Sequence, residues 1–172
     1  MAIVPDTKNW TWVLERECPE CGFDSSATQA SDVPGLLRVN ASAWPAVLER
    51  DDVAVRPDEA TWSDLEYAAH VRDVFRIFLV RLELMLDEDD PEFANWDQDV
   101  TAIEERYNEQ DPAVVAVELA EAAEALALAF ESVPDDAWER KGFRGDGSAF
   151  TVDTLARYMV HDPVHHLDDV KG

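Results

Sequence analysis

The histidines of this chain lie in two stretches whose residue types could bind a metal ion. One of the four is His70, and the other three fall within residues 161–166. Residues four apart share a face of a helix, so the second stretch can present Asp162 and His166 together. One histidine from one helix and such a pair from another can hold a divalent metal with a coordination position left open. An open position is what a metal needs to act on a substrate.

Helical periodicity separates two possible pairs within residues 161–166. Because each residue of a regular helix turns the chain by about 100°, Asp162 and His166 lie on one edge of the apolar side, whereas His161 and His165 lie nearly opposite it. A ligand must face inward to meet the other helix, which favours Asp162 and His166. Pro163 can bend the helix or coincide with a bulge that rotates His161 inward. The pair His161 and His165 therefore remains an alternative.

Three of the four histidines also have a purely structural interpretation. His70 borders an apolar stripe, where a histidine can simply be a hydrogen-bonded core residue. His165 and His166 lie near the end of the last expected helix, where positive charge interacts favourably with the helix dipole. The metal hypothesis rests on all of these groups occurring together in a chain without other histidines.

The two cysteines form the segment Cys18-Pro19-Glu20-Cys21-Gly22. Cys-x-x-Cys followed by glycine is typical of a turn that aims two thiolates at one ion, but a closed zinc site needs four ligands and no second such motif exists. Three interpretations stay open: a tight turn with reduced thiols, a metal site completed by other residues, and a labile disulfide. A redox switch at this dithiol is a further, weaker hypothesis.

Hydrophobic patterning and capping signals predict four long helices. Ser63 and Glu66 form a capping box at the start of the clearest one, Asp111-Pro112 opens another, and Thr151 caps the last. Pro45 predicts a kink or an offset start in the first. The expected helices span about residues 32–48, 64–86, 112–133 and 152–170.

The remaining segments are expected to be short or irregular. A short helix is expected near residues 100–105, a hairpin or ordered loop at 138–150, and an extended piece at 10–14. The sequence thus predicts an all-α four-helix bundle with long crossover connections over residues 32–172, preceded by an irregular lead-in over residues 1–31 that carries Cys-x-x-Cys.

Composition excludes several functions. Asp and Glu number 38 against 14 Lys and Arg, so the formal charge of −24 repels phosphate backbones and anionic membrane surfaces. The apolar runs are shorter than the about 20 residues of a membrane span, and the residues after Met1 lack a leader pattern. We expect no nucleic-acid or membrane partner and a cytoplasmic location.

The same histidine segments resemble the DinB-like superfamily. The likeness rests on Trp-Ser-x-x-Glu-x-x-x-His at residues 62–70, and on residues 150–152 followed by His-Asp-x-x-His-His-Leu at 161–167. The resemblance implies a four-helix bundle that binds a divalent metal, most commonly zinc or nickel, through His70, Asp162 and His166. Many relatives have histidine in place of Asp162, and the mycothiol-dependent maleylpyruvate isomerases have glutamate. Aspartate at this position is chemically tolerable as a ligand, and the departure leaves His161 and His165 as the alternative ligand pair.

The resemblance also implies an activity. Its characterised members are similar to S-transferases or isomerases that use a low-molecular-weight thiol such as mycothiol or bacillithiol, and a three-ligand metal can lower the pKa of such a thiol or of water. Arg140, Lys141 and Arg144 are candidates to bind an anionic thiol or substrate, or are ordinary surface charge. The leading hypothesis is a metal-dependent thiol transferase or hydrolase acting on a small molecule. The alternative is a non-catalytic helical interaction or stress-response protein. Bundles of this kind often form homodimers, although no interface is identifiable in the sequence.

Overall fold

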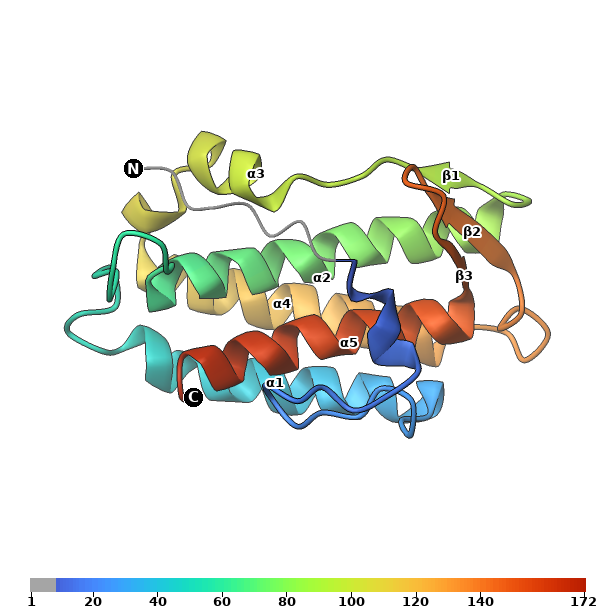
Figure 1. Ribbon diagram of the computed structural model, residues 1–172, viewed down its shortest axis with the longest axis horizontal. Coiled ribbons are helices and arrows are strands. Elements are labelled where there is room, and N and C mark those ends of the chain that lie inside the picture. The colour runs from blue at the N-terminus through green and yellow to red at the C-terminus, as the bar shows by residue number, and fades with distance from the viewer. Residues whose placement is uncertain (1–8) are drawn as a thin grey trace.

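Four long helices form the body of the computed structural model, which describes residues 9–172 (Figure 1). They are α1 (Val33–Leu48), α2 (Asp64–Asp87), α4 (Pro112–Glu131) and α5 (Val152–Asp169). Helix α4 packs on both α1 and α2, and α5 packs on the same two helices from the other side. The predicted all-α four-helix bundle is confirmed.

The order of the helices requires one connection to cross the length of the bundle. In Figure 1, α2 and α4 run in one direction and α1 and α5 in the other, so the chain after α2 returns along the outside before α4 begins. That return carries strand β1 (Glu92–Phe93), helix α3 (Gln98–Glu104) and the 3-10 helix η3 (Tyr107–Glu109). The turn from α4 to α5 stays at one end of the bundle.

A small sheet closes that end. Strand β2 (Lys141–Arg144) pairs antiparallel with β3 (Ala149–Thr151), which makes residues 138–150 a hairpin, one of the two forms expected. Strand β1 pairs parallel with β2. The sequence did not predict β1, because two residues carry no readable periodicity.

The predicted caps are present. Ser63 accepts a hydrogen bond from the Glu66 amide, and the Glu66 carboxylate accepts one from the Ser63 amide. Asp111 caps α4 with Pro112 at its first position, and Thr151 caps α5. Pro45 lies inside α1, and α5 stays α-helical through Pro163, so neither an offset start nor a bulge occurs.

The helices bury one contiguous apolar core, because each long helix is apolar along a stripe that faces its neighbours. Its largest fully buried side chains include Trp44, Phe75, Phe130, Leu155 and Met159. Within the described part of the chain, no helix combines the length and apolar character that crossing a membrane requires.

The segment before α1 lies against the bundle. The 3-10 helix η1 (Trp10–Leu14) packs on α5, and η2 (Ala30–Asp32) packs on both α1 and α5. The extended conformation expected for residues 10–14 is wrong, because the Asn9 side chain accepts the Thr11 amide and starts a helical turn whose apolar residues lie on α5. The described part of the lead-in therefore covers one face of the last helix (Figure 1).

Candidate metal centre

Helices α2 and α5 bring His70, Asp162 and His166 together. His70 lies in the second turn of α2, and the other two lie one turn apart on α5, which packs beside it. Each residue offers one ligand atom, and these atoms all lie within 4.8 Å of one another. The structure thus places the three sequence-selected residues in one group at the contact between two helices.

Asp162 is at the centre of this group. Its Oδ1 lies 3.3 Å from Nε2 of His70 and 3.8 Å from Nε2 of His166. Two nitrogen or oxygen ligands about 2.0–2.1 Å from one tetrahedral ion lie roughly 3.3–3.4 Å apart. The first distance has this value and the second is slightly wider, so the three donors are spaced as ligands of one ion would be.

The hydrogen bonding of Asp162 is incomplete. Its Oδ2 lies 3.5 Å from the His70 ring nitrogen, but Oδ1 is buried and has no hydrogen-bond partner among the residues that the structure describes. Although burial alone raises the pKa of Asp162, His70 and His166 lower it below its usual value, so the carboxyl group is ionised. A buried anionic oxygen facing two imidazole nitrogens suits a cation, because an unpaired buried charge is costly.

Aromatic rings fix the position of His70. The imidazole is fully buried, stacks on Trp96 with ring centres 5.2 Å apart and planes 4° apart, and contacts Trp62 at 5.2 Å. Its Nδ1 has no hydrogen-bond partner within the described chain. Packing therefore orients this ring, and Nε2 faces Asp162.

A carboxylate orients His166. Nδ1 of His166 lies 2.9 Å from Oδ2 of Asp169, so the ring donates its Nδ1 proton there and its Nε2 faces Asp162. Partial burial raises the pKa of Asp169 but His166 lowers it further, which keeps Asp169 ionised. Tyr67 packs on the same ring, and burial raises the pKa of Tyr67 to about 12. Tyr67 is therefore a neutral hydrogen-bond donor and not a base.

The other two histidines belong to a different group. His161 and His165 gather with Cys18 and Cys21 of the lead-in and not with His70. Helical periodicity had placed them opposite the core, and His161 is nevertheless buried, because the lead-in covers that face of α5. Burial lowers the pKa of His161 to about 4, and the neighbouring His165 contributes to this shift, so the ring of His161 is neutral.

Two of the three basic residues considered for anion binding have other roles. Arg140 donates to the carbonyl oxygens of Met85 and Glu88, and Arg144 donates to Asp146 and Tyr158. Both lie around the small sheet, which stands where α2 ends and α5 begins (Figure 1), whereas His70 is in the second turn of α2. These side chains stabilise the sheet end of the bundle.

Two contributors to the site were missed in the sequence. Asp169 ends the short run of histidine and acidic residues at 165–169, and its i,i+3 spacing from His166 was a readable signal. Trp96 lies in the irregular crossover, where no periodicity could have predicted its stacking on His70. A shallow depression of about 330 Å³ adjoins Trp96 and is lined also by Arg72, Arg76 and Thr101.

Comparisons with known proteins agree with this architecture. The family model described as the DinB superfamily matches residues 38–170, and no curated protein sequence matches the chain significantly. Among solved structures, the chain resembles YfiT from Bacillus subtilis, described as a probable metal-dependent hydrolase with an unusual four-helix bundle topology. The TM-score is 0.64 with 15% identity, over 99% of this chain and 92% of that chain. At this identity, the likeness concerns the fold.

Proposed function

The chain belongs to the DinB superfamily, and from this premise we propose that it is a metal-dependent enzyme in which His70, Asp162 and His166 hold one divalent ion, zinc or nickel. The observation that carries the proposal is the buried Asp162 Oδ1, which has no hydrogen-bond partner within the described chain although it faces the Nε2 atoms of both histidines. Two imidazoles and one carboxylate are a common ligand set of catalytic zinc.

Three protein ligands leave a coordination position for a small molecule. The bound ion would polarise a substrate oxygen, or lower the pKa of water or of a thiol. Asp162 and His166 are partly exposed, at 33% and 17% of their side chains, whereas His70 is fully buried. The exposed edge therefore gives a small substrate access, and His70 anchors the site from inside.

The chain's own residues prepare this site for reaction. Trp62 and Trp96 exclude water from the inner face of His70. Asp169 fixes the His166 ring, and neutral Tyr67 beside that ring can donate a hydrogen bond to a developing negative charge.

Hydrolysis is the reaction class that we favour. The similar structure of YfiT is described as a probable metal-dependent hydrolase, and hydrolysis requires only water at the open position. Transfer to a low-molecular-weight thiol would in addition need a cationic host near the metal. The three basic residues first considered for that role lie at the other end of the bundle, and the arginines beside Trp96, Arg72 and Arg76, are paired with Asp73 and Glu118.

Metal analysis of purified, tag-free protein tests the proposal. We expect nickel or cobalt added to the protein to bind at a site with nitrogen and oxygen ligands, and this binding to be lost in His70→Ala and His166→Ala. Asp162→His should keep the ion, because relatives with three histidines imply that the position tolerates imidazole. Asp168→Asn is the matched control, since Asp168 lies on the same turn of α5 as His166 and its side chain pairs with Lys171.

Activity is measured on the same samples with small esters and amides, with and without an added low-molecular-weight thiol. Turnover that needs the metal but no thiol supports the hydrolase, and turnover that needs the thiol would favour a transferase. Identical metal binding in wild type and His70→Ala would contradict the proposal and leave a non-catalytic bundle.

A further inference from the structure

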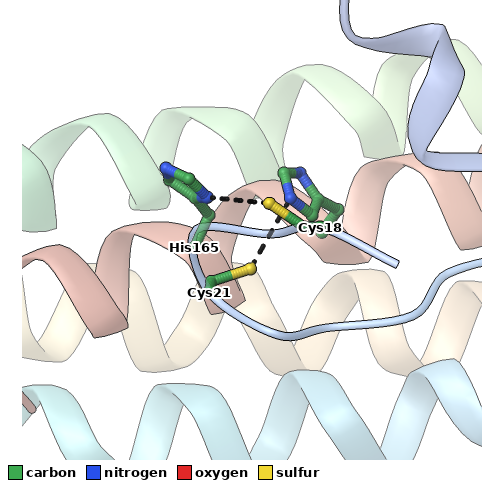
Figure 2. A group of neighbouring side chains, drawn as sticks. Cys18, Cys21 and His165 are labelled. Carbon is green, nitrogen blue, oxygen red and sulfur yellow. Dashed lines mark hydrogen bonds between the residues drawn. The ribbon is translucent and has the colours of Figure 1, made fainter. Parts of the chain in front are cut away.

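A second group of metal-ligating side chains lies on the neighbouring face of α5. Cys18 and Cys21 from the lead-in meet His161 and His165, and one ligand atom from each lies within 4.8 Å of all the others. Figure 2 shows both cysteine side chains directed from their turn toward α5, where His165 lies opposite Cys18. Cys18 is 147 residues from His165 in the sequence, and Cys21 is 140 residues from His161.

The cysteine turn is built to aim both sulfurs in one direction. The Cys18 amide donates to the Phe23 carbonyl at 2.9 Å, and the Gly22 amide donates to the Cys18 carbonyl at 2.8 Å. Gly22 has a φ of +72°, a left-handed conformation that glycine adopts without strain. Cys18 is fully buried and Cys21 half-buried, and both are free thiols.

The histidines of α5 are equally well placed. His161 and His165 have the H-x3-H spacing that puts two imidazoles on one helical face, and Cys-x2-Cys with H-x3-H is the ligand spacing of Cys2His2 zinc sites. The Cys18 sulfur lies 3.8 Å from Nδ1 of His165, and the Cys21 sulfur lies 3.7 Å from Nε2 of His161. In a tetrahedral site with Zn–S of about 2.3 Å and Zn–N of about 2.0–2.1 Å, a sulfur and a nitrogen ligand lie roughly 3.6 Å apart.

From this geometry we propose that Cys18, Cys21, His161 and His165 bind a structural zinc ion that fastens the lead-in to helix α5. Two thiolates and two neutral imidazoles balance the charge of Zn²⁺, so the filled site is neutral and can be buried at low cost. Four protein ligands complete the tetrahedron, so this ion has no open position and is structural.

The surroundings fit this assignment. Nε2 of His165 lies 3.5 Å from the Glu20 carboxylate and 3.8 Å from that of Asp169, which are partners expected for the outer nitrogen of a zinc-bound imidazole. Trp10 of η1 covers both rings, with ring centres 5.5 Å from His161 and 5.4 Å from His165. The site is thus enclosed by the segment that it would fasten.

The position of this ion also bears on the proposed catalytic metal. His161 and His165 alternate along α5 with Asp162 and His166, each one residue before a residue of the three-ligand group. Asp169 has one carboxylate oxygen toward His166 and the other toward His165. The zinc ion fixes the turn of α5 from which the other site takes two of its ligands.

The experiment uses full-length protein reconstituted with zinc under reducing conditions. We expect two zinc ions per chain in wild type, and one in His70→Ala, whose remaining ion reports the cysteine site alone. X-ray absorption of zinc-loaded His70→Ala should show two sulfur ligands at about 2.3 Å together with two nitrogen ligands. A zinc shell of nitrogen and oxygen only would overturn the proposal.

Cobalt substitution gives an independent measurement. Thiolate-to-cobalt charge-transfer absorption should persist in His70→Ala, weaken in Cys18→Ser and in Cys21→Ser, and disappear when both cysteines are replaced by serine. Circular dichroism checks that these variants fold. If they do not, the His70→Ala spectrum still decides the question, because it leaves the cysteines unchanged.

The outcomes separate this proposal from the proposed function. One ion per wild-type chain with sulfur ligands supports the structural zinc and contradicts the three-ligand site. One ion without sulfur ligands does the reverse. An intact mass showing a Cys18–Cys21 disulfide in protein that takes up no zinc after reduction would also overturn the structural zinc site.

Discussion

Replacing Asp169 by asparagine tests how the outer carboxylate supports the candidate catalytic ligands. Asp169 accepts the Nδ1 proton of His166 at 2.9 Å, which orients the ring and makes its other nitrogen a stronger donor. Asparagine keeps the shape and one acceptor oxygen but loses the negative charge. The variant should therefore weaken metal binding without removing a ligand.

The size of the effect follows from this contact. Loss of such a partner typically lowers metal affinity by about 10–100-fold. At a free metal concentration of about 100 times the wild-type Kd, bound metal stabilises the fold by about 2.7 kcal/mol. A site with 10- to 100-fold lower affinity would lose roughly 1.3–2.3 kcal/mol of this stabilisation. For a chain of this size, about 2–4 °C per kcal/mol converts this loss to a melting temperature lower by roughly 3–9 °C.

Competition between the protein and a chromophoric chelator for cobalt measures the affinity. The chelator reports the total cobalt bound to the protein, and the thiolate absorption reports the cobalt bound at the cysteine site. The difference between the two amounts is the cobalt bound at the three-ligand site. We expect a smaller effect at the cysteine site, because Asp169 is 3.8 Å from His165 and Glu20 is closer at 3.5 Å.

Asp168→Asn is the matched control, because it makes the same charge change one residue away, where the side chain is 48% exposed and pairs with Lys171. Its cobalt affinity should match that of wild type. Equal affinity and equal melting temperature in Asp169→Asn and Asp168→Asn would refute the assignment of His166 as a ligand oriented by Asp169.

Two further predictions concern the scaffold. Glu66→Gln should lower the free energy of unfolding by about 1–3 kcal/mol at neutral pH, because it removes the charge from a buried capping carboxylate paired with Arg56. Burial raises the pKa of Glu66, but Arg56 and the cap lower it further, so the folded-state pKa lies below the ordinary value of 4.5. The stabilisation by the ionised carboxylate is therefore complete above about pH 4.5 and is lost as the pH falls through the folded-state pKa. Urea unfolding should show the gap between wild type and variant closing below that pH, and a gap independent of pH would contradict the ionised cap. Gly142→Ala should cost about 1–3 kcal/mol in the same assay, since the new methyl group would lie 2.7 Å from the buried Met85 side chain. The methyl group that Gly35→Ala would add meets no described atom within 4 Å apart from the adjacent residues and backbone of its own helix, so this variant should be neutral or stabilising. Equal losses in both variants would refute the packing argument.

Local signals in the sequence were sufficient to predict the helices and the face of the last helix that carries Asp162 and His166. The capping box at Ser63 and the Asp111-Pro112 start are contacts within a few residues, so their outcome did not depend on the rest of the fold. Helical periodicity alone put Asp162 and His166 on one edge of the last helix. The structure then brought His70 to that edge, because the two apolar stripes pack together.

The face of α5 that carries His161 and His165 shows the limit of that reasoning. Periodicity identifies the side that faces the bundle core, and it assigned these two residues to the opposite side. It contains no information on where a separate, irregular segment crosses the helix. The lead-in covers this face, buries His161 and places two cysteines beside it.

The sequence by itself thus determined the elements whose causes are local: the helix boundaries, their apolar stripes and the spacing of potential ligands along each helix. Only the tertiary structure decided which spacings meet, because contacts across 140 residues depend on the path of the whole chain. The cysteines lie beside His161 and His165, and Asp169 lies between His165 and His166. Arg140 and Arg144 lie at the sheet end of the bundle, away from His70. Ligand types can be read from a sequence, but their convergence is a property of packing.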